Sequence, residues 1–164
     1  MRKRMYYGLL LAVTMLVSAP LAYSKGAPDK ITITGGGLSQ QIDVIDPDTL
    51  KAYNPWGGQF IDWSRGVTNV SPQGPQTYEV QFLKKSDRGD IKVIYAVLYA
   101  PGNSGEPGYV YLPGRGEKWY RQNTGTILRD GDDGRWHYAT PAFGELVRRR
   151  VTDSGSHSSP PPPN

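Results

Sequence analysis

His137 is the candidate general base of this sequence. The chain has two histidines, and the other, His157, lies in a Ser/Pro-rich terminal stretch. Hydrolysis by a Ser–His–acid arrangement needs a base near neutral pH, but the Gly-x-Ser-x-Gly motif is missing from the sequence. In the run RWHYA, strand alternation places Trp136 and Tyr138 on one face and His137 on the other. We interpret His137 as a strand-surface residue rather than a catalytic one.

Carboxylates offer a second kind of chemistry. Glycoside hydrolysis needs an acid and a base or nucleophile about 5–10 Å apart in a cleft. Because the sequence does not show which carboxylates face one another, each of them is kept as a candidate. The candidates are Asp43, Asp62, Glu79, Glu106 and Glu117.

The run DGDDG carries Asp130, Asp132 and Asp133, which are oxygen ligands of the kind that Ca²⁺ prefers. An EF-hand loop beginning at Asp130 would need Gly at its sixth position and Glu at its twelfth, where this chain has Arg135 and Pro141. Asp and Gly also dominate hairpin turns for conformational reasons. The chain has no cysteine, which excludes thiolate metal sites, disulfides and a Cys nucleophile. We expect no metal and no cofactor.

The candidate binding residues are Trp56, Phe60, Asp62 and Trp63, in the segment NPWGGQFIDW. They belong to a long irregular stretch over residues 54–76, and loops of this length are usually functional or disordered. Two indoles near an acid could stack on a sugar ring or anchor a protein partner. Alternatively, both indoles fold inward over one end of a sheet, which is the reading we favour because large apolar side chains are usually buried.

The elements that would position these residues are mostly strands. Gly and Pro are abundant, with 20 and 14 residues, which indicates frequent turns and excludes a helix bundle. Period-2 alternation and turn signals together with helix-capping residues predict a mainly β fold, an antiparallel sandwich or open barrel with two short helices. The expected strands are 30–34, 38–44, 78–83, 91–99, 109–112, 119–121, 124–129 and 135–139, and the expected helices are 47–53 and 141–150.

The N-terminus has the pattern of a secretory signal peptide over residues 1–24. Three basic residues precede an apolar stretch over residues 9–21, and small residues at Ala22 and Ser24 place cleavage before Lys25. An uncleaved N-terminal anchor is the alternative. We expect residues 25–152 to form a single domain and residues 153–164 to be a disordered Ser/Pro-rich tail.

Charge and hydropathy limit the classes of partner that the sequence predicts. The formal net charge is +4, but losing three basic residues with the signal leaves 16 basic residues against 15 acidic ones. This near-neutral balance argues against nucleic-acid binding. Beyond the signal the chain has no apolar run of about 18 residues, so no transmembrane segment is expected after cleavage.

Three segments, ITITGGGLSQQIDVID, NPWGGQFIDW and GYVYLPGRGEKWY…NTGTILRDG, resemble exported bacterial proteins with no assigned biochemical function. The similarity runs across most of the chain after the signal. It implies export and a single domain, and it carries no catalytic residue over to this sequence.

The sequence therefore favours an exported, soluble, non-catalytic module that binds a protein or glycan outside the cytoplasm, in the cell envelope or the medium. The alternative is a small carboxylate-based hydrolase acting on extracellular or cell-envelope polysaccharide, with two carboxylates facing each other in an aromatic-lined groove. A structural envelope protein without a ligand pocket is the third possibility.

Overall fold

The computed structural model describes residues 26–68, 76–103, 105–127, 129 and 131–156. The predicted signal peptide, residues 1–24, lies outside the described residues, as does the predicted tail from His157 onward. Within the described ranges, no helix has the length and apolar character needed to cross a membrane.

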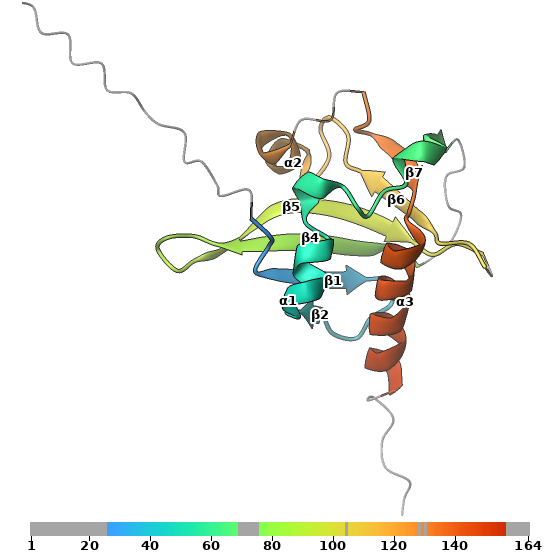
Figure 1. Cartoon of the computed structure of the whole chain (residues 1–164), viewed down its shortest axis with the longest axis horizontal. Helices are drawn as coiled ribbons and strands as arrows, with labels where there is room; N and C mark the ends of the chain where they lie inside the picture. Colours follow the sequence, from blue (N-terminus) through green and yellow to red (C-terminus); the bar gives the residue numbers. More distant parts are fainter. Residues whose placement is uncertain (1–25, 69–75, 104, 128, 130, 157–164) are drawn as a thin grey trace, which may run out of the picture.

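Seven strands form one antiparallel sheet in the order β2-β1-β4-β5-β6-β7-β3 (Figure 1). The mainly β, antiparallel fold predicted from the sequence is confirmed, as an open sheet that does not close into a barrel. The strands are β1 (Lys30–Gly35), β2 (Ile42–Val44), β3 (Val67–Thr68), β4 (Tyr78–Lys85), β5 (Ile91–Ala100), β6 (Tyr109–Leu112) and β7 (Arg135–Tyr138).

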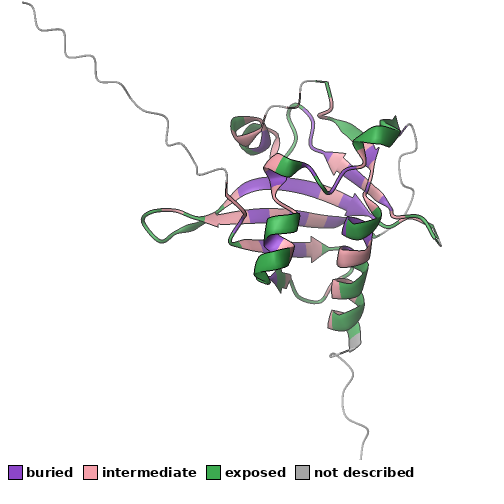
Figure 2. Cartoon of the chain, viewed as in Figure 1, coloured by how far each residue is buried: buried purple, intermediate pink, exposed green. Residues whose placement is uncertain are grey.

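One face of the sheet carries the hydrophobic core. Alternate residues of the strands, such as Ile31, Val80 and Phe82, point to this face and are at most 1% exposed. The helices α1 (Pro47–Ala52) and α3 (Pro141–Ser156) cover it, together with the segment around the 3₁₀ helix η1 (Pro55–Gly57) (Figures 1 and 2). Burial of this single face therefore fixes the register of the strands.

The two predicted helix starts are confirmed by their caps. Asp46 accepts hydrogen bonds from the backbone N–H of Thr49 (2.9 Å) and from its hydroxyl (2.6 Å). Thr140 accepts one from the backbone N–H of Phe143 at 3.3 Å. Because these caps satisfy N–H groups that have no partner within the helix, they set where α1 and α3 begin.

The strands predicted over 119–121 and 124–129 are wrong. The chain instead forms the helix α2 (Tyr120–Thr126). Asn123 is fully buried, accepts a hydrogen bond from the backbone N–H of Ala96 (2.8 Å) and donates one to its carbonyl (2.7 Å). Thr126 also donates to the carbonyl of Ile94 at 2.6 Å. Because β6 pairs only with the last residues of β5, α2 covers the remaining edge of β5 with polar side chains.

Two boundaries also differ from the prediction. The helix predicted over 141–150 continues to Ser156, so residues 153–156 of the predicted disordered tail are helical. Leu146 and Val151 pack against the core, which extends the apolar stripe of this helix beyond residue 150. The strand predicted over 38–44 is shorter, because Leu38 closes a turn by donating its backbone N–H to the Gly35 carbonyl at 3.0 Å and pairing begins only at Ile42.

Candidate functional site

The four binding residues predicted from the loop do not share one open surface. Phe60 is fully buried in the core, with its ring centroid 5.4 Å from that of Phe82 and 5.9 Å from that of Phe143. Trp56 is partly buried and packs against the same core. Trp63 is the exposed member, with 40% of its surface accessible. Phe60 therefore offers no surface to a ligand, and Trp56 offers only part of its ring.

Asp62 and Trp63 both have structural partners. Asp62 caps the 3₁₀ helix η2 (Trp63–Arg65), and the hydrogen bonds from the side chain and backbone of Ser64 lower the pKa of its carboxyl. The indole of Trp63 lies 5.4 Å from the His137 ring, and the Arg129 guanidinium lies over it at 4.9 Å. Arg129 also donates to the carbonyl of Pro55 at 2.8 Å, so it ties this loop to the body of the protein.

His137 is buried, which corrects its predicted place on the surface of a strand. It is 1% exposed because Trp63 and η2 cover this end of β7. Its Nε2 lies 3.0 Å from the Asp132 carbonyl, and its Nδ1 has no hydrogen-bond partner among the described residues. The alternation itself holds, because the register puts His137 opposite Val110 and puts Trp136 opposite Tyr111.

The face of the sheet opposite the core is aromatic over β6 and β7. Tyr109 pairs with Tyr138 and Tyr111 pairs with Trp136, with ring centroids 5.7 Å and 5.1 Å apart. All four rings are only partly buried. Cross-strand aromatic pairs stabilise a sheet, and the Arg65 guanidinium lies over the Tyr138 ring, 3.6 Å from its centroid. We call these four residues the aromatic face.

A groove of about 440 Å³ lies at one end of the aromatic face and is lined by two of the candidate carboxylates, Glu79 and Glu117. Tyr111 and Trp136 contribute from the strands, and Trp119 contributes from the start of α2. We call this cavity the aromatic groove. Its lining is Glu79, Leu98, Tyr111, Pro113, Glu117, Lys118, Trp119 and Trp136.

The turn between β6 and α2 carries four of these residues and is held by hydrogen bonds. The carboxylate of Glu117 accepts hydrogen bonds from the Tyr111 hydroxyl (2.9 Å) and from the backbone N–H of Gly114 (2.8 Å). Gly114 lies so close to Gly134 that a Cβ on it would be 2.8 Å from the Gly134 Cα. Only glycine fits there without displacing the turn, so this contact fixes the position of Glu117.

Trp119 has a left-handed backbone, with φ of +73°, and is the only described non-glycine residue with a positive φ. This conformation costs on the order of 1–3 kcal/mol and is found at ligand clamps and active sites. Its observation at a residue lining the aromatic groove therefore supports a functional role for the groove.

Glu79 and Lys118 form the charged wall of the groove. The Lys118 ammonium lies 3.1 Å and 3.0 Å from the two carboxylate oxygens of Glu79, and 4.7 Å from the centroid of the Trp119 ring. Burial opposes ionisation of Glu79, but hydrogen bonds from Gln81 and Lys118 outweigh it, and the pKa of this carboxyl is lowered. Burial and the hydrogen bond to Glu117 raise the pKa of Tyr111.

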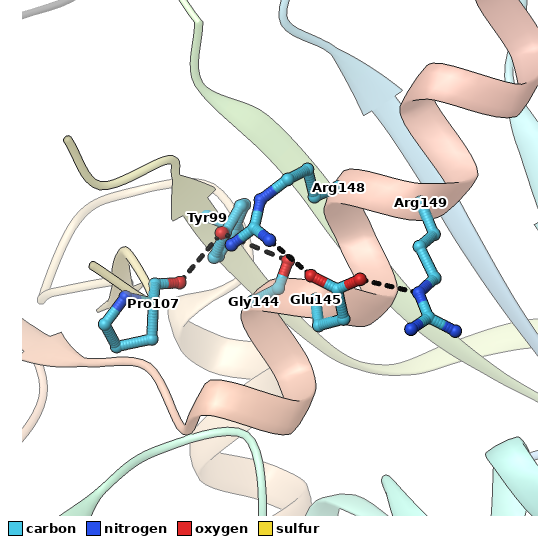
Figure 3. A network of polar contacts seen from close by, with 6 residues as sticks. All are labelled: Tyr99, Pro107, Gly144, Glu145, Arg148 and Arg149. Atoms are coloured by element: carbon cyan, nitrogen blue, oxygen red, sulfur yellow. Dashed lines mark hydrogen bonds and ion pairs between the residues drawn. The ribbon is translucent and has the colours of Figure 1, made fainter. Parts of the chain in front are cut away.

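A larger cavity, of about 840 Å³, lies on the core side between α3 and the loop after β5. Its aromatic walls, Tyr78 and Tyr99, are 3% and 2% exposed, so they offer little surface to a ligand. The Tyr99 hydroxyl donates to the Pro107 carbonyl at 2.9 Å, while Glu145 is paired with both Arg148 and Arg149 (Figure 3). Burial raises the pKa of Tyr99 to about 12. The Tyr99 hydroxyl and the Glu145 carboxylate of this cavity are therefore already bound to groups of the protein itself.

The structure brings together two of the five candidate carboxylates, Glu79 and Glu117, and places the others elsewhere. Glu106 lies 3.7 Å from Arg65, and Asp43 pairs with Lys30 at 3.0 Å. Of the three aspartates weighed as calcium ligands in the sequence, Asp130 lies outside the described residues. Within the described part of the chain, no three His, Asp or Glu side chains are grouped so that they could hold a metal ion.

The aromatic groove was only partly visible in the sequence. Alternation in RWHYA placed Trp136 and Tyr138 on one face of a strand, and the same alternation in YVYL is the signal that would have placed Tyr109 with Tyr111. Their joining into one surface depends on the pairing of β6 with β7, and Trp119 joins them through a turn. Comparisons with protein-family models, with curated proteins and with solved structures found no match to this chain.

Proposed function

We propose that the protein is a non-catalytic module that binds a carbohydrate chain through the aromatic groove and the aromatic face beside it. The observation that supports this proposal is the gathering of partly exposed rings on the sheet face opposite the core, next to two fixed carboxylates. Ligand sites typically combine aromatic walls with a few well-placed polar groups. The rings would stack on sugar rings, and the carboxylates of Glu79 and Glu117 would accept hydrogen bonds from hydroxyls.

Action outside the cytoplasm is part of the same proposal. It is supported by the signal-peptide pattern of residues 1–24. A glycan of the cell envelope or the medium is then the class of partner that the groove would meet.

The experiment is a binding titration of the purified chain against soluble oligosaccharides, with variants of two tryptophans. Trp136→Ala removes a ring that belongs to both the groove and the aromatic face, and we expect affinity to fall about 30-fold, which corresponds to the roughly 2 kcal/mol typical of a binding hot spot. Trp63→Ala is the matched control, because Trp63 is exposed but packs against His137 on the opposite side of β7. Equal losses in the two variants, or no loss in Trp136→Ala, would contradict the proposal.

A carboxylate-based hydrolase is the second candidate, because Glu79 and Glu117 line the same groove. The lowered pKa of Glu79 is opposite to the raised pKa that a general acid needs. Glu117 is already occupied by Tyr111 and the Gly114 backbone. Turnover of any bound oligosaccharide that is lost in both Glu79→Gln and Glu117→Gln would favour the hydrolase over the binding module.

A further inference from the structure

Lys118 places an ammonium group inside the aromatic groove. Its Nζ lies within 3.1 Å of both carboxylate oxygens of Glu79 and 4.7 Å from the centre of the Trp119 ring. A cation between a carboxylate and an indole face is the arrangement that proteins use to recognise ammonium ligands. The chain therefore supplies its own cation to this position.

The ammonium is the exchangeable member of the pair. The side chain of Lys118 is 68% exposed, whereas that of Glu79 is 19% exposed and is held on strand β4. Lysine carries its charge on a flexible stem, and exposed ion pairs contribute little to stability. Moving the Lys118 ammonium into solvent is consequently easy, while the Glu79 carboxylate stays in place.

The charges that line the groove favour a cation. Glu79 and Glu117 supply two carboxylates, and Lys118 is the one basic residue of the lining. When Lys118 swings out, the groove presents two negative charges together with the rings of Trp119, Trp136 and Tyr111. Cations bind most strongly over the face of tryptophan.

We propose that the groove binds a glycan that carries protonated amino groups, and that an ammonium of this amino sugar displaces Lys118 from Glu79. This inference rests on the proposed function, because it assigns a ligand class to the same groove. Sugar carbons would lie against the indoles, and the ammonium would take the place between Glu79 and Trp119.

The test compares two glucosamine oligosaccharides of equal length, one with free amines and one fully N-acetylated, by calorimetric titration of the full chain. The pH is set where the free amines are protonated. Glu79 remains ionised there because its pKa is lowered. We expect the amine form to bind at least about tenfold more tightly, in line with the loss of a close charge pair and a cation–π contact in the acetylated form.

Two variants separate the partners of the ammonium. Glu79→Gln should remove most of the preference for the amine form, because it removes the charge pair and leaves only the contact with the Trp119 ring. Lys118→Met should raise the affinity for the amine form several-fold, because it removes the competing ammonium, and should leave the acetylated form unchanged. Glu145→Gln is the matched control, since Glu145 is also an ion-paired acid but lies on α3, on the core side of the sheet. It should change neither affinity.

The outcomes distinguish the two proposals. Equal binding of both oligosaccharides, unaffected by Glu79→Gln but weakened by Trp136→Ala, would overturn the amino-sugar inference and leave the carbohydrate-binding proposal intact. Binding of neither oligosaccharide would overturn the amino-sugar inference, and the titration with other soluble oligosaccharides then decides the carbohydrate-binding proposal. Weaker binding of the amine form in Lys118→Met would show that Lys118 holds the ligand rather than competing with it, and would also overturn the inference. Thermal unfolding of each variant verifies that it is folded.

Discussion

Replacing Asn123 with alanine tests how α2, and with it Trp119, is held against the sheet. The Asn123 side chain is fully buried and makes two short hydrogen bonds to the backbone of Ala96, at 2.8 Å and 2.7 Å. It therefore acts as a substitute for a neighbouring strand at this position of β5. In Asn123→Ala, both the N–H and the carbonyl of Ala96 lose their partner in a buried environment.

The magnitude follows from the cost of unsatisfied buried groups. Each group costs about 1–3 kcal/mol, so we expect the free energy of unfolding to fall by roughly 2–5 kcal/mol. The melting temperature should fall by roughly 3–6 °C for each kcal/mol in a domain of this size. The free energy is measured by urea unfolding followed by far-UV circular dichroism, and the melting temperature by a thermal scan.

Two further variants sharpen this test. Gln122→Ala, next in the same helix, removes an exposed side chain whose contacts to Ile94 and Thr126 are as long as 3.5 Å and 3.4 Å, and should change stability by less than about 0.5 kcal/mol. Asn123→Asp keeps the acceptor but loses the donor. Burial raises the pKa of such a carboxyl, so this variant should regain stability as pH falls. If Asn123→Ala cost less than about 1 kcal/mol, the account of α2 as a cover for the β5 edge would be refuted.

The remaining predictions concern a close helix contact and a carboxylate of the groove. A Cβ on Gly144 would lie 2.0 Å from the Pro107 carbonyl oxygen, so Gly144→Ala should destabilise the fold by about 1–3 kcal/mol in urea unfolding. Gly125→Ala in α2, where a Cβ meets no atom within 4 Å, should be neutral or stabilising, and equal effects would refute this contact. The pKa of Glu79 is lower in the folded state, so its contribution to stability is present above the pKa of an ordinary glutamate and is lost as pH falls through the lowered value. Glu79→Gln should therefore reduce the loss of stability on acidification, measured by unfolding across a pH series, and an unchanged pH profile would contradict the lowered pKa.

Sequence patterns correctly predicted the strands that bury one face and the helices that begin at a capping residue. Ile31 and Ile33 alternate with polar residues, and in the structure they face the core from β1. Asp46 and Thr140 cap helices in the predicted positions. In each case the physical cause, alternation or capping, acts between residues close in sequence.

The wrong predictions, for the 119–129 segment and for His137, concern residues whose structure depends on contacts with distant parts of the sequence. The segment YRQNTGT has no apolar periodicity, and its helix depends on Asn123 and Thr126 bonding to β5 residues 27 and 32 positions away. His137 is buried because Trp63, far away in the sequence, lies on its ring. Local propensity cannot predict tertiary contacts of this kind.

At the candidate site, too, the sequence predicted the local arrangement but not the contacts between distant segments. The sequence placed Trp136 and Tyr138 on one face of a strand, and the structure agrees. It did not predict that Trp119 would join them, because this depends on the left-handed backbone of Trp119 and on the turn held by Glu117. Instead, the cluster of aromatic residues in the 56–63 loop drew attention to a segment whose Phe60 belongs to the core.

The central claim, that a glycan covers the indoles of the aromatic groove, is tested most directly by quenching of tryptophan fluorescence with acrylamide. The chain has four tryptophans, so a variant with Trp56→Phe and Trp63→Phe reports only on the groove, and one with Trp119→Phe and Trp136→Phe reports only on the loop. A saturating glucosamine oligosaccharide should reduce quenching in the first variant, where the groove indoles are intact. The same oligosaccharide should leave quenching in the second variant unchanged. Undiminished quenching in the first variant, or protection of the loop indoles in the second, would contradict the account.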